Sequence, residues 1–254
     1  MNNVSLILNG TCYQMMRSAK CSNRDKFSRA AKLLHSYNKI LDKMNGIIYR
    51  GHSTSEMARL ALCVKLLMTT GIRVGNESSA EGYMTKLHPH EKGEPHFTQT
   101  YGLTTIKTSH VSTRGRYTYL NFIGKKSVEN SFRLEGFIAR QLKRVIEWSK
   151  SNDEDTIFSV SAYQLTKFIK KYVGRQFSPK DFRTMRANMY AWEKLTDLEK
   201  YYNPTTKKEF RAEQKDICTY VSEHLNNTPA VCKKNYIDPK FWDEFSELRY
   251  IDKD

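Results

Sequence analysis

The chain has 254 residues, of which 39% are hydrophobic and 27% are charged. This balance is typical of a globular protein and excludes a disordered chain, a collagen-like fibre and a membrane bundle. The 42 Lys and Arg residues against 27 Asp and Glu residues give a formal net charge of +15. Such an excess indicates a polyanionic partner, most often nucleic acid and less often an anionic membrane. The longest apolar stretch, residues 60–68, contains Lys65 and falls far short of the ~20 residues of a membrane span.

The cysteine content indicates a reducing compartment. Five cysteines are present and no two form a C-x-x-C pair, which disfavours a secreted disulfide framework. The first residues do not show a basic start followed by an apolar run and a small-residue cleavage site, so no secretory signal is predicted. We therefore expect an intracellular protein in the cytoplasm or a nucleoid-like DNA compartment, with a nucleus, a viral factory or a virion left open.

The N-terminal part of the chain predicts an arm followed by two helices. Residues 1–22 carry little periodicity and are expected to form the arm. Ser22 begins a stretch that resembles a capping box, and apolar residues then recur at helical spacing over 27–44, with Gly46 as the expected stop. A second apolar stripe predicts a helix over 55–71.

The region of about residues 101–133 changes to β-branched and aromatic composition, which favours strands. Turn signals at 112–115 and 124–127 divide it. We expect a small antiparallel meander with Lys125 at the tip of a hairpin. The strands are expected within residues 104–106, 117–123 and 128–133.

Helical patterns resume after the meander, and Ser178-Pro179 and Thr228-Pro229 each supply an N-cap followed by a proline at the first helical position. In the helix that begins at Ser178, Arg183 is expected at the edge of the buried stripe, where it can reach an anion. The chain is therefore predicted to be mainly α with one small antiparallel β meander, an α+β domain over residues 23–254. The expected helices cover about 134–150, 161–174, 178–193, 207–225 and 229–236.

Five segments, in this order, resemble the catalytic domain of type IB DNA topoisomerases of the poxviral and bacterial kind. The resemblance covers about residues 25–245, and it implies the fold shared by tyrosine recombinases and type IB topoisomerases. The segments are Ile72-Arg73-Val74-Gly75-Asn76-Glu77, Tyr101-Gly102-Leu103-Thr104-Thr105, Phe122-Ile123-Gly124-Lys125-Lys126, Lys180-Asp181-Phe182-Arg183-Thr184 and Asn227-Thr228-Pro229-Ala230-Val231 followed by Tyr236.

The resemblance implies a role for one residue of each segment. Tyr236 is expected to attack a DNA phosphodiester, form a 3′-phosphotyrosyl link and release a 5′-hydroxyl strand. Arg73 and Arg183 are expected to grip the non-bridging oxygens, and Lys125 to protonate the leaving 5′ oxygen. Asn227 stands where poxviral enzymes carry a histidine. Supercoiled DNA would be relaxed by nicking, rotation and resealing, with no cofactor, ATP or metal.

The chemistry of these residue types fits the implied reaction. Arginine offers planar, permanently charged, bidentate donors to the oxygens on which charge concentrates in a five-coordinate transition state. One such donor is worth a few kcal/mol in a preorganised site. A phenol is mostly protonated at pH 7, and flanking cations favour its anionic form as it attacks. Nearby arginines make a lysine a better proton donor.

Double-stranded DNA is the expected partner, bound by a monomer, and no membrane is expected. Members of this family normally carry a separate β-rich N-terminal domain that closes a clamp around the duplex, and residues 1–24 are too short for it. A separate polypeptide could supply that domain. The residues expected to contact DNA are Lys180, Lys126, Thr184, Tyr101, Lys107, Lys233 and Lys234.

Two other functions are compatible with the sequence. One is a tyrosine recombinase, although recombinases usually show His-x-x-Arg where this chain has Lys180-x-x-Arg183. The other is a basic DNA-binding protein without catalysis, since a charge of +15 suffices for non-specific binding.

Two further patterns are weaker. Residues 124–127 superficially suggest a phosphate loop, but Tyr119 replaces the first required glycine. His88, His90 and His96 allow a zinc site, but their polar surroundings favour a flexible loop. This loop makes the stretch from residue 77 to residue 101 longer than is usual in the family.

Overall fold

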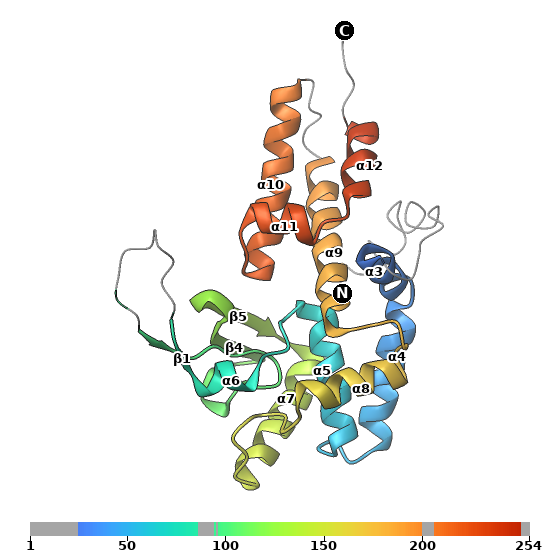
Figure 1. Cartoon of the computed structure of the whole chain (residues 1–254). Coiled ribbons are helices and arrows are strands. Elements are labelled where there is room, and N and C mark those ends of the chain that lie inside the picture. Colours follow the sequence, from blue (N-terminus) through green and yellow to red (C-terminus); the bar gives the residue numbers. More distant parts are fainter. Residues whose placement is uncertain (1–24, 86–93, 95, 200–205, 250–254) are drawn as a thin grey trace. The chain divides into compact units, whose positions relative to one another are not determined.

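The structure is a computed structural model that describes residues 25–85, 94, 96–199 and 206–249 (Figure 1). The chain divides into two compact units. Unit 1 is built from Met1–Tyr37, Met68–Gly71 and Lys180–Asp254, and unit 2 from Asn38–Leu67 and Ile72–Pro179. The expected N-terminal arm lies outside the described residues. Within the described residues, no helix is both long and apolar enough to cross a membrane.

Unit 1 is helical, and its core is built by four helices that are consecutive in the chain. Aromatic side chains fill this core: the ring centroids of Trp192 and Phe241 lie 4.9 Å apart and those of Phe241 and Phe245 lie 6.2 Å apart. An ion pair of 3.0 Å between Arg29 Nε and Asp181 Oδ1 joins the first helix of the unit to the second. The first helix of the unit is α3 (Lys26–His35). The four helices that build the core are α9 (Pro179–Glu199), α10 (Lys207–Leu225), α11 (Pro229–Asn235) and α12 (Pro239–Arg249).

Unit 2 combines helices with two small antiparallel sheets (Figure 1). Its helices are α4 (Tyr37–Arg50), most of α5 (Glu56–Thr70), α6 (Glu77–Glu81), α7 (Gly136–Ser151) and α8 (Ala162–Tyr172), with short 3₁₀ turns η1 (Thr108–His110) and η2 (Lys125–Ser127). The first sheet pairs β1 (Tyr83–Met84) with β2 (Phe97–Thr98), and the second has the order β3 (Val111–Arg114), β4 (Tyr117–Gly124), β5 (Val128–Leu134).

The three-stranded sheet has one buried face. Leu120 and Phe122 on β4 and Phe132 and Leu134 on β5 are buried, whereas the residues that alternate with them along β5 are exposed. This alternation follows from the two-residue period of a strand, which sends successive side chains to opposite faces. The sheet thus presents its apolar side to the core and leaves the other side to solvent.

Most of the predicted helices are confirmed, but the first one is not continuous. It breaks at Ser36 into α3 and α4, and α4 passes through Gly46 to end at Arg50. The N-cap of α3 is Asp25, whose carboxylate accepts from the backbone N–H groups of Phe27 and Ser28. Gly46 is not a stop because a glycine inside a helix costs only about 1 kcal/mol. Helices α6 and α12 were not predicted from the sequence.

The small antiparallel meander is confirmed, but its first strand was misplaced. That strand is Val111–Arg114 and not residues 104–106, and the turn follows it at Gly115, which has φ +58°. Thr104 and Thr105 are buried in a hydrogen-bonded turn, where the backbone N–H of Thr104 donates to the carbonyl of Val74 at 2.7 Å. Their β-branched side chains pack there without joining a sheet, because the hydroxyl groups donate to the carbonyls of Val74 and Gly102 inside the turn.

Candidate active site

Arg73 and Lys125 line the same cavity in unit 2. Its volume is about 390 Å³. Arg73 is half-buried and Lys125 is exposed, so one cation forms part of the wall and the other projects from the rim. The remaining lining residues are Val74, Gly75, Asn76, Ser79, Tyr83, Thr100 and Tyr101.

The segment from Tyr101 to Leu103 connects the two cations through the main chain. The backbone N–H of Leu103 donates to the carbonyl of Arg73 at 2.8 Å. The backbone N–H of Tyr101 donates to the carbonyl of Ile123 at 2.7 Å, two residues before Lys125. The Arg73 backbone and the end of β4 are therefore tied to one short segment, which fixes how the Arg73 and Lys125 main chains lie relative to each other.

Glycine is required where the backbone at Gly102 meets the backbone of Arg73 and Gly75. A Cβ on Gly102 would lie 2.7 Å from the carbonyl oxygen of Arg73 and 2.6 Å from the Cα of Gly75. Gly75 itself has φ +105°, a conformation that L side chains rarely adopt. The backbones can approach this closely only because neither position carries a side chain.

Lys125 and Lys126 sit in the tight turn η2 between β4 and β5. Lys126 and Ser127 both have positive φ, at 65° and 55°, and two non-glycine residues in this region indicate a strained turn. A Cβ on Gly124 would overlap the side-chain amide of Asn130. The predicted position of Lys125 at a hairpin tip is confirmed, and the turn displays both lysine side chains to solvent.

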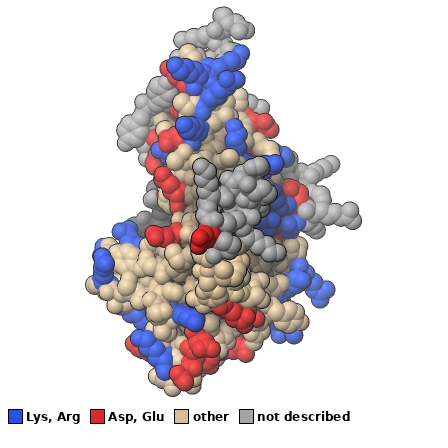
Figure 2. Space-filling view, turned by 60° about the vertical axis from the view of Figure 1, so that its left-hand side comes forward, with Lys and Arg blue, Asp and Glu red and all other residues tan. Residues whose placement is uncertain are grey.

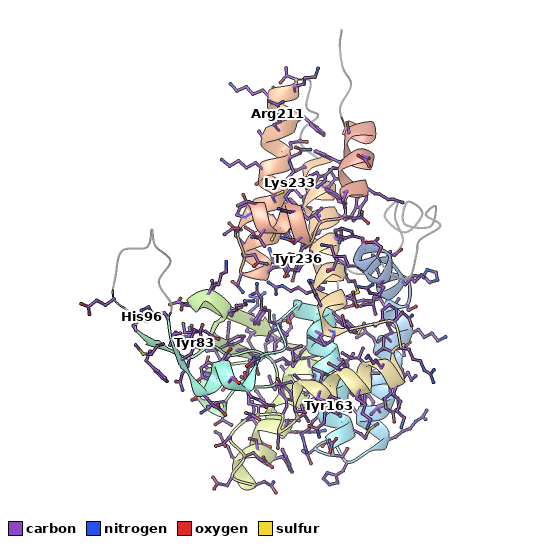
Figure 3. The ribbon with its side chains drawn as sticks, in the orientation of Figure 1. Tyr83, His96, Tyr163, Arg211, Lys233 and Tyr236 are labelled. Atoms are coloured by element: carbon purple, nitrogen blue, oxygen red, sulfur yellow. The ribbon has the colours of Figure 1, made fainter. Side chains whose placement is uncertain are left out.

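Tyr236 closes helix α11 in unit 1 (Figure 3). Its backbone N–H donates to the carbonyl of Cys232 at 3.0 Å. Cys232 and Ile237 are both fully buried, and the Tyr236 ring packs against the same core cluster while staying partly exposed. The two buried neighbours thus anchor the main chain on both sides of the tyrosine, and its side chain remains accessible.

Arg183 lies on α9 beside this tyrosine, with its guanidinium carbon 5.3 Å from the centroid of the Tyr236 ring. Arg183 is 4% exposed, more buried than the edge position that the sequence predicts. Its Nη1 donates to the carbonyl of Gly71 at 2.6 Å and its Nη2 donates to the carbonyl of Leu225. These two carbonyls hold the guanidinium in place, so the positive charge is positioned before any substrate arrives.

Asn227 lies in the short connection between α10 and α11. Asn226 caps α10 in the left-handed conformation, with φ 49° and ψ 63°, a typical way for asparagine to end a helix. The backbone N–H of Asn227 then donates to the carbonyl of Ser222 at 3.0 Å, and Thr228 caps α11. The connection therefore brings Asn227 into the same unit as Arg183 and Tyr236.

Asn188, which the sequence analysis did not select, holds the backbone around Tyr236. Its side-chain amide donates to the carbonyl of Tyr236 at 2.9 Å, and its Oδ1 accepts from the backbone N–H of Asp238 at 2.8 Å. Asn188 is 3% exposed and lies on the same helix as Arg183. One available signal was an amide among the apolar residues of the buried face of α9, since a buried amide must find hydrogen-bond partners.

The residues expected to contact DNA differ in exposure. Tyr101 is half-buried in the cavity wall. Thr184 is fully buried, and its hydroxyl donates to the carbonyl of Lys180 at 3.3 Å. It packs inside the protein, because the turn of α9 that carries it faces the core. The exposed members are Lys107, Lys126, Lys180, Lys233 and Lys234.

The histidine-rich stretch is described only in part. His88 and His90 lie outside the described residues. His96 accepts from the backbone N–H of Thr85 through its own carbonyl at 2.9 Å, an arrangement that continues the pairing of β1 and β2. Among the residues whose placement is described, no group of three His, Cys, Asp or Glu side chains could hold a metal ion.

The structure thus gives two sets of site residues, one in each unit. Arg73 and Lys125 share a cavity in unit 2, and Arg183, Asn227 and Tyr236 belong to unit 1. The first set consists of two cations, and the second places a cation beside a phenol. The cations of both sets are suited to binding a phosphate ester, and the phenol of the second set could attack it.

A comparison with protein families decides which family this chain represents. The model of the family described as eukaryotic DNA topoisomerase I, catalytic core, matches residues 16–248. The chain belongs to this family. The matched region corresponds to the catalytic core of the family. This agrees with the resemblance of the five sequence segments to type IB topoisomerases.

Two individual proteins are similar to this topoisomerase-family chain. DNA topoisomerase 1B of Acanthamoeba polyphaga mimivirus is 24% identical over 231 residues, which are 85% of this chain and 63% of the viral protein. The chain thus spans less than two thirds of the length of that relative. A solved structure of the XerH site-specific recombinase bound to its difH substrate is similar with a TM-score of 0.46 and 13% identity, covering 83% of this chain and 53% of that chain.

Proposed function

We propose that this chain is a type IB DNA topoisomerase that relaxes supercoiled DNA by cutting and resealing one strand. The observation that carries the proposal is the Arg183 guanidinium held 5.3 Å from the ring of Tyr236 in a chain of the topoisomerase I catalytic-core family. A fixed cation beside an accessible phenol supplies both the nucleophile and a group that stabilises charge on the attacked phosphate.

The proposed reaction exchanges one phosphoester bond for another. The phenolic oxygen of Tyr236 attacks the phosphorus, its proton passes to solvent, and the bond from phosphorus to the 5′ oxygen breaks. The ammonium group of Lys125 gives a proton to that leaving oxygen. The product is a 3′-phosphotyrosyl link and a 5′-hydroxyl strand. Because the new ester conserves the energy of the broken one, the reverse reaction reseals the strand without ATP.

The cations of the site neutralise the developing charge. Arg73 and Arg183 are proposed to donate to the non-bridging oxygens, and Asn227 to add a neutral donor there. The proposal requires both sets of residues to act on the same phosphodiester. Each preorganised donor to such a transition state contributes roughly 3–4 kcal/mol in enzymes where one has been removed.

Double-stranded DNA is the proposed substrate, and a monomer is proposed to act on it in a compartment that contains DNA. The net charge of +15 supports binding to the phosphate backbone. In unit 1 the exposed cations include Lys233 and Lys234 on α11 and Lys207, Arg211 and Lys215 on α10, and Figure 3 labels Lys233 and Arg211. Phosphate contacts of this kind position a protein on DNA without selecting a sequence.

Relaxation of a supercoiled plasmid in EDTA and without ATP tests the proposal. The wild-type chain is expected to relax the plasmid, and denaturation during the reaction is expected to trap protein on DNA. Tyr236→Phe should abolish both signals. Tyr163→Phe is the matched control, because it also removes one phenolic hydroxyl but from an exposed tyrosine of α8, and it should retain full activity.

Three results would contradict the proposal. Full relaxation by Tyr236→Phe would show that another group is the nucleophile. Tight DNA binding without any trapped species would show a binding protein and no enzyme. Strand joining between two separate DNA molecules, with tetramers of the protein on DNA, would show a recombinase.

A further inference from the structure

Helix α3 contacts both of the segments that carry Tyr236 and Arg183 in unit 1. Lys26 and Arg29 are three residues apart on this helix, so they lie on the same face, and the buried Leu33 continues that face. Figure 2 shows Lys and Arg side chains at many places on the surface that it draws. Lys26 and Arg29 differ from exposed cations of this kind, because both are half-buried and both bind protein groups.

Lys26 holds the peptide unit that leads into the proposed nucleophile. Its ammonium donates to the carbonyl of Asn235 at 2.8 Å. Asn235 ends α11, and the last carbonyls of a helix have no partner within the helix and attract cations. The carbonyl of Asn235 shares one planar peptide unit with the N–H of Tyr236. Because that N–H donates to the carbonyl of Cys232, both polar groups of the unit are held.

Arg29 holds the start of α9, which lies beside α3 (Figure 1). Its Nε lies 3.0 Å from Oδ1 of Asp181, whose side chain is only 2% exposed. Hydrogen bonds between charged groups are roughly twice as strong as those between neutral groups. Asp181 lies in the first turn of α9, two residues before Arg183. The ion pair therefore fixes the turn of α9 that leads into Arg183.

We propose that α3 positions Tyr236 against Arg183, with Lys26 and Arg29 as the two positioning residues. This inference rests on the proposed function. One rigid helix joins the backbone before the phenol to the start of the helix that carries the guanidinium, so the two groups keep their separation. Lys26 complements Asn188, because Asn188 bonds the carbonyl of Tyr236 and Lys26 bonds the carbonyl of the residue before it.

Single-turnover cleavage at saturating DNA tests the role of Lys26. Lys26→Met removes the ammonium group and is expected to cleave about 10–100-fold more slowly, because small displacements of a reacting group have effects of this size. Lys26→Arg keeps a cationic donor and should retain most of the wild-type rate. Lys39→Met is the matched control, because it removes the same charge from an exposed lysine of α4. It should cleave at the wild-type rate, and the two Met variants should bind DNA equally well.

A double variant tests whether the two contacts act together. Either broken contact already separates α3 from one of the two segments, so Lys26→Met/Arg29→Gln should lose less cleavage than the product of the two single losses. A loss equal to that product would show two independent contacts and would contradict joint positioning by α3. If Arg29→Gln does not fold, the Lys26 variants decide the proposal.

Amide hydrogen exchange without DNA tests the Lys26 contact independently of catalysis. Lys26→Met should speed exchange at Tyr236 and Ile237, whose N–H groups both donate to the carbonyl of Cys232, and should leave exchange in α7 of unit 2 unchanged.

The outcomes separate this proposal from the proposed function. Wild-type cleavage by Lys26→Met at saturating DNA would overturn the positioning role, and a loss confined to DNA affinity would make Lys26 a phosphate contact instead. If the wild-type chain fails to relax a plasmid while Lys26→Met speeds exchange at Tyr236, the proposed function is wrong and the hold of α3 on the tyrosine stands. If relaxation succeeds and exchange and cleavage do not change, only the positioning proposal is wrong.

Discussion

The side-chain amide of Asn188 donates a hydrogen bond of 2.9 Å to the carbonyl oxygen of Tyr236. The same side chain accepts a hydrogen bond from the backbone N–H of Asp238 at 2.8 Å. One buried amide therefore holds the main chain on both sides of Ile237, directly after the proposed nucleophile. This makes Asn188 a positioning residue for Tyr236.

Replacing Asn188 with Ala should slow formation of the covalent complex about 10–100-fold, because small displacements of a reacting group have effects of this size. Loss of the buried hydrogen bonds should also lower the free energy of unfolding by about 1–3 kcal/mol. Single-turnover cleavage and DNA affinity are measured on the folded variant. A positioning role lowers the cleavage rate and leaves the affinity unchanged.

Asn188→Asp separates the two hydrogen bonds. The carboxylate still accepts from the Asp238 backbone but no longer donates to the Tyr236 carbonyl. The cleavage rate is therefore expected to fall below that of the wild type, because the bond to Tyr236 is lost. A folded Asn188→Ala chain that cleaves at the wild-type rate would show that the bond to Tyr236 has no part in catalysis.

The proposed proton donor is tested by changing the leaving group. Lys125→Ala should lower the cleavage rate about 10²–10⁴-fold, the range that general acid catalysis contributes. A substrate with sulfur in place of the 5′ bridging oxygen releases a thiolate, which needs no proton because thiols have a pKa near 8.5. Cleavage of that substrate by Lys125→Ala should approach the wild-type rate.

The adjacent lysine and the cavity arginine are the controls for this experiment. Lys126→Ala, altered in the same turn, should retain most of the cleavage rate on both substrates. Arg73→Ala should be impaired on both, because sulfur does not replace a donor to the non-bridging oxygens. Equal impairment of Lys125→Ala on the two substrates would assign the proton transfer to another group.

The close approach at Gly102 predicts a large effect of a single methyl group. A Cβ at this position would lie 2.7 Å from the carbonyl of Arg73, and the neighbouring backbone can relieve this only by shifting. Gly102→Ala should therefore lower the free energy of unfolding by about 2–3 kcal/mol, the upper part of the range for overpacking. Gly46→Ala is the control: a Cβ there meets nothing within 4 Å, and alanine should stabilise helix α4 by about 0.5–1 kcal/mol. Urea unfolding measures both, and the same sign of change for the two variants would contradict the structure.

Lys65 predicts a specific pH dependence of stability. It is 5% exposed, its Nζ lies 4.1 Å from the centroid of the Phe137 ring, and it donates to Asn45. Burial lowers the pKa of this lysine to about 8, from 10.5. Between pH 8 and 10.5 the unfolded chain therefore binds more protons at this lysine than the folded chain does. Lys65 lowers the stability of the fold by its full amount below pH 8, and by progressively less as the pH rises to 10.5.

Lys65→Met should remove this effect. Near pH 7 the variant is expected to be more stable than the wild type by about 1–3 kcal/mol, and the difference should shrink as the pH approaches 10.5. Comparing the two chains at each pH cancels other titrating groups, including the nearby thiol of Cys63, whose pKa burial raises. A difference in stability that does not depend on pH between 7 and 10 would show that the lysine titrates normally.

Periodicity and capping residues were sufficient to predict most helices. The pairs Ser178-Pro179 and Thr228-Pro229 mark the starts of α9 and α11 to within one residue. The two-residue strands β1 and β2 are too short to produce a pattern, so they were not predicted. Residues 104–106 were misread because β-branched residues suit both a strand and a buried turn.

The candidate site was predicted residue by residue, but its supporting contacts were not. The resemblance of five segments to type IB topoisomerases suggests Arg73, Lys125 and Tyr236, yet nothing in the sequence shows that Arg183 binds two backbone carbonyls or that Asn188 holds the Tyr236 backbone. Such contacts join residues far apart in the chain and arise only from tertiary packing. Thr184, the last residue of one matched segment, was expected to contact DNA, but its side chain is buried.

The hydrogen bond from Leu103 to the carbonyl of Arg73 closes a loop, since the chain leaves the cavity after Arg73 and returns to the same place 30 residues later. The segment between these two residues, which contains α6, β1 and β2, is therefore a loop whose two ends are held together by a backbone hydrogen bond. The entropic cost of closing such a loop grows only slowly with its length. Segments can therefore be inserted or exchanged between Arg73 and Leu103 without moving Arg73, so the surface beside the cavity can vary while the cation inside it keeps its place.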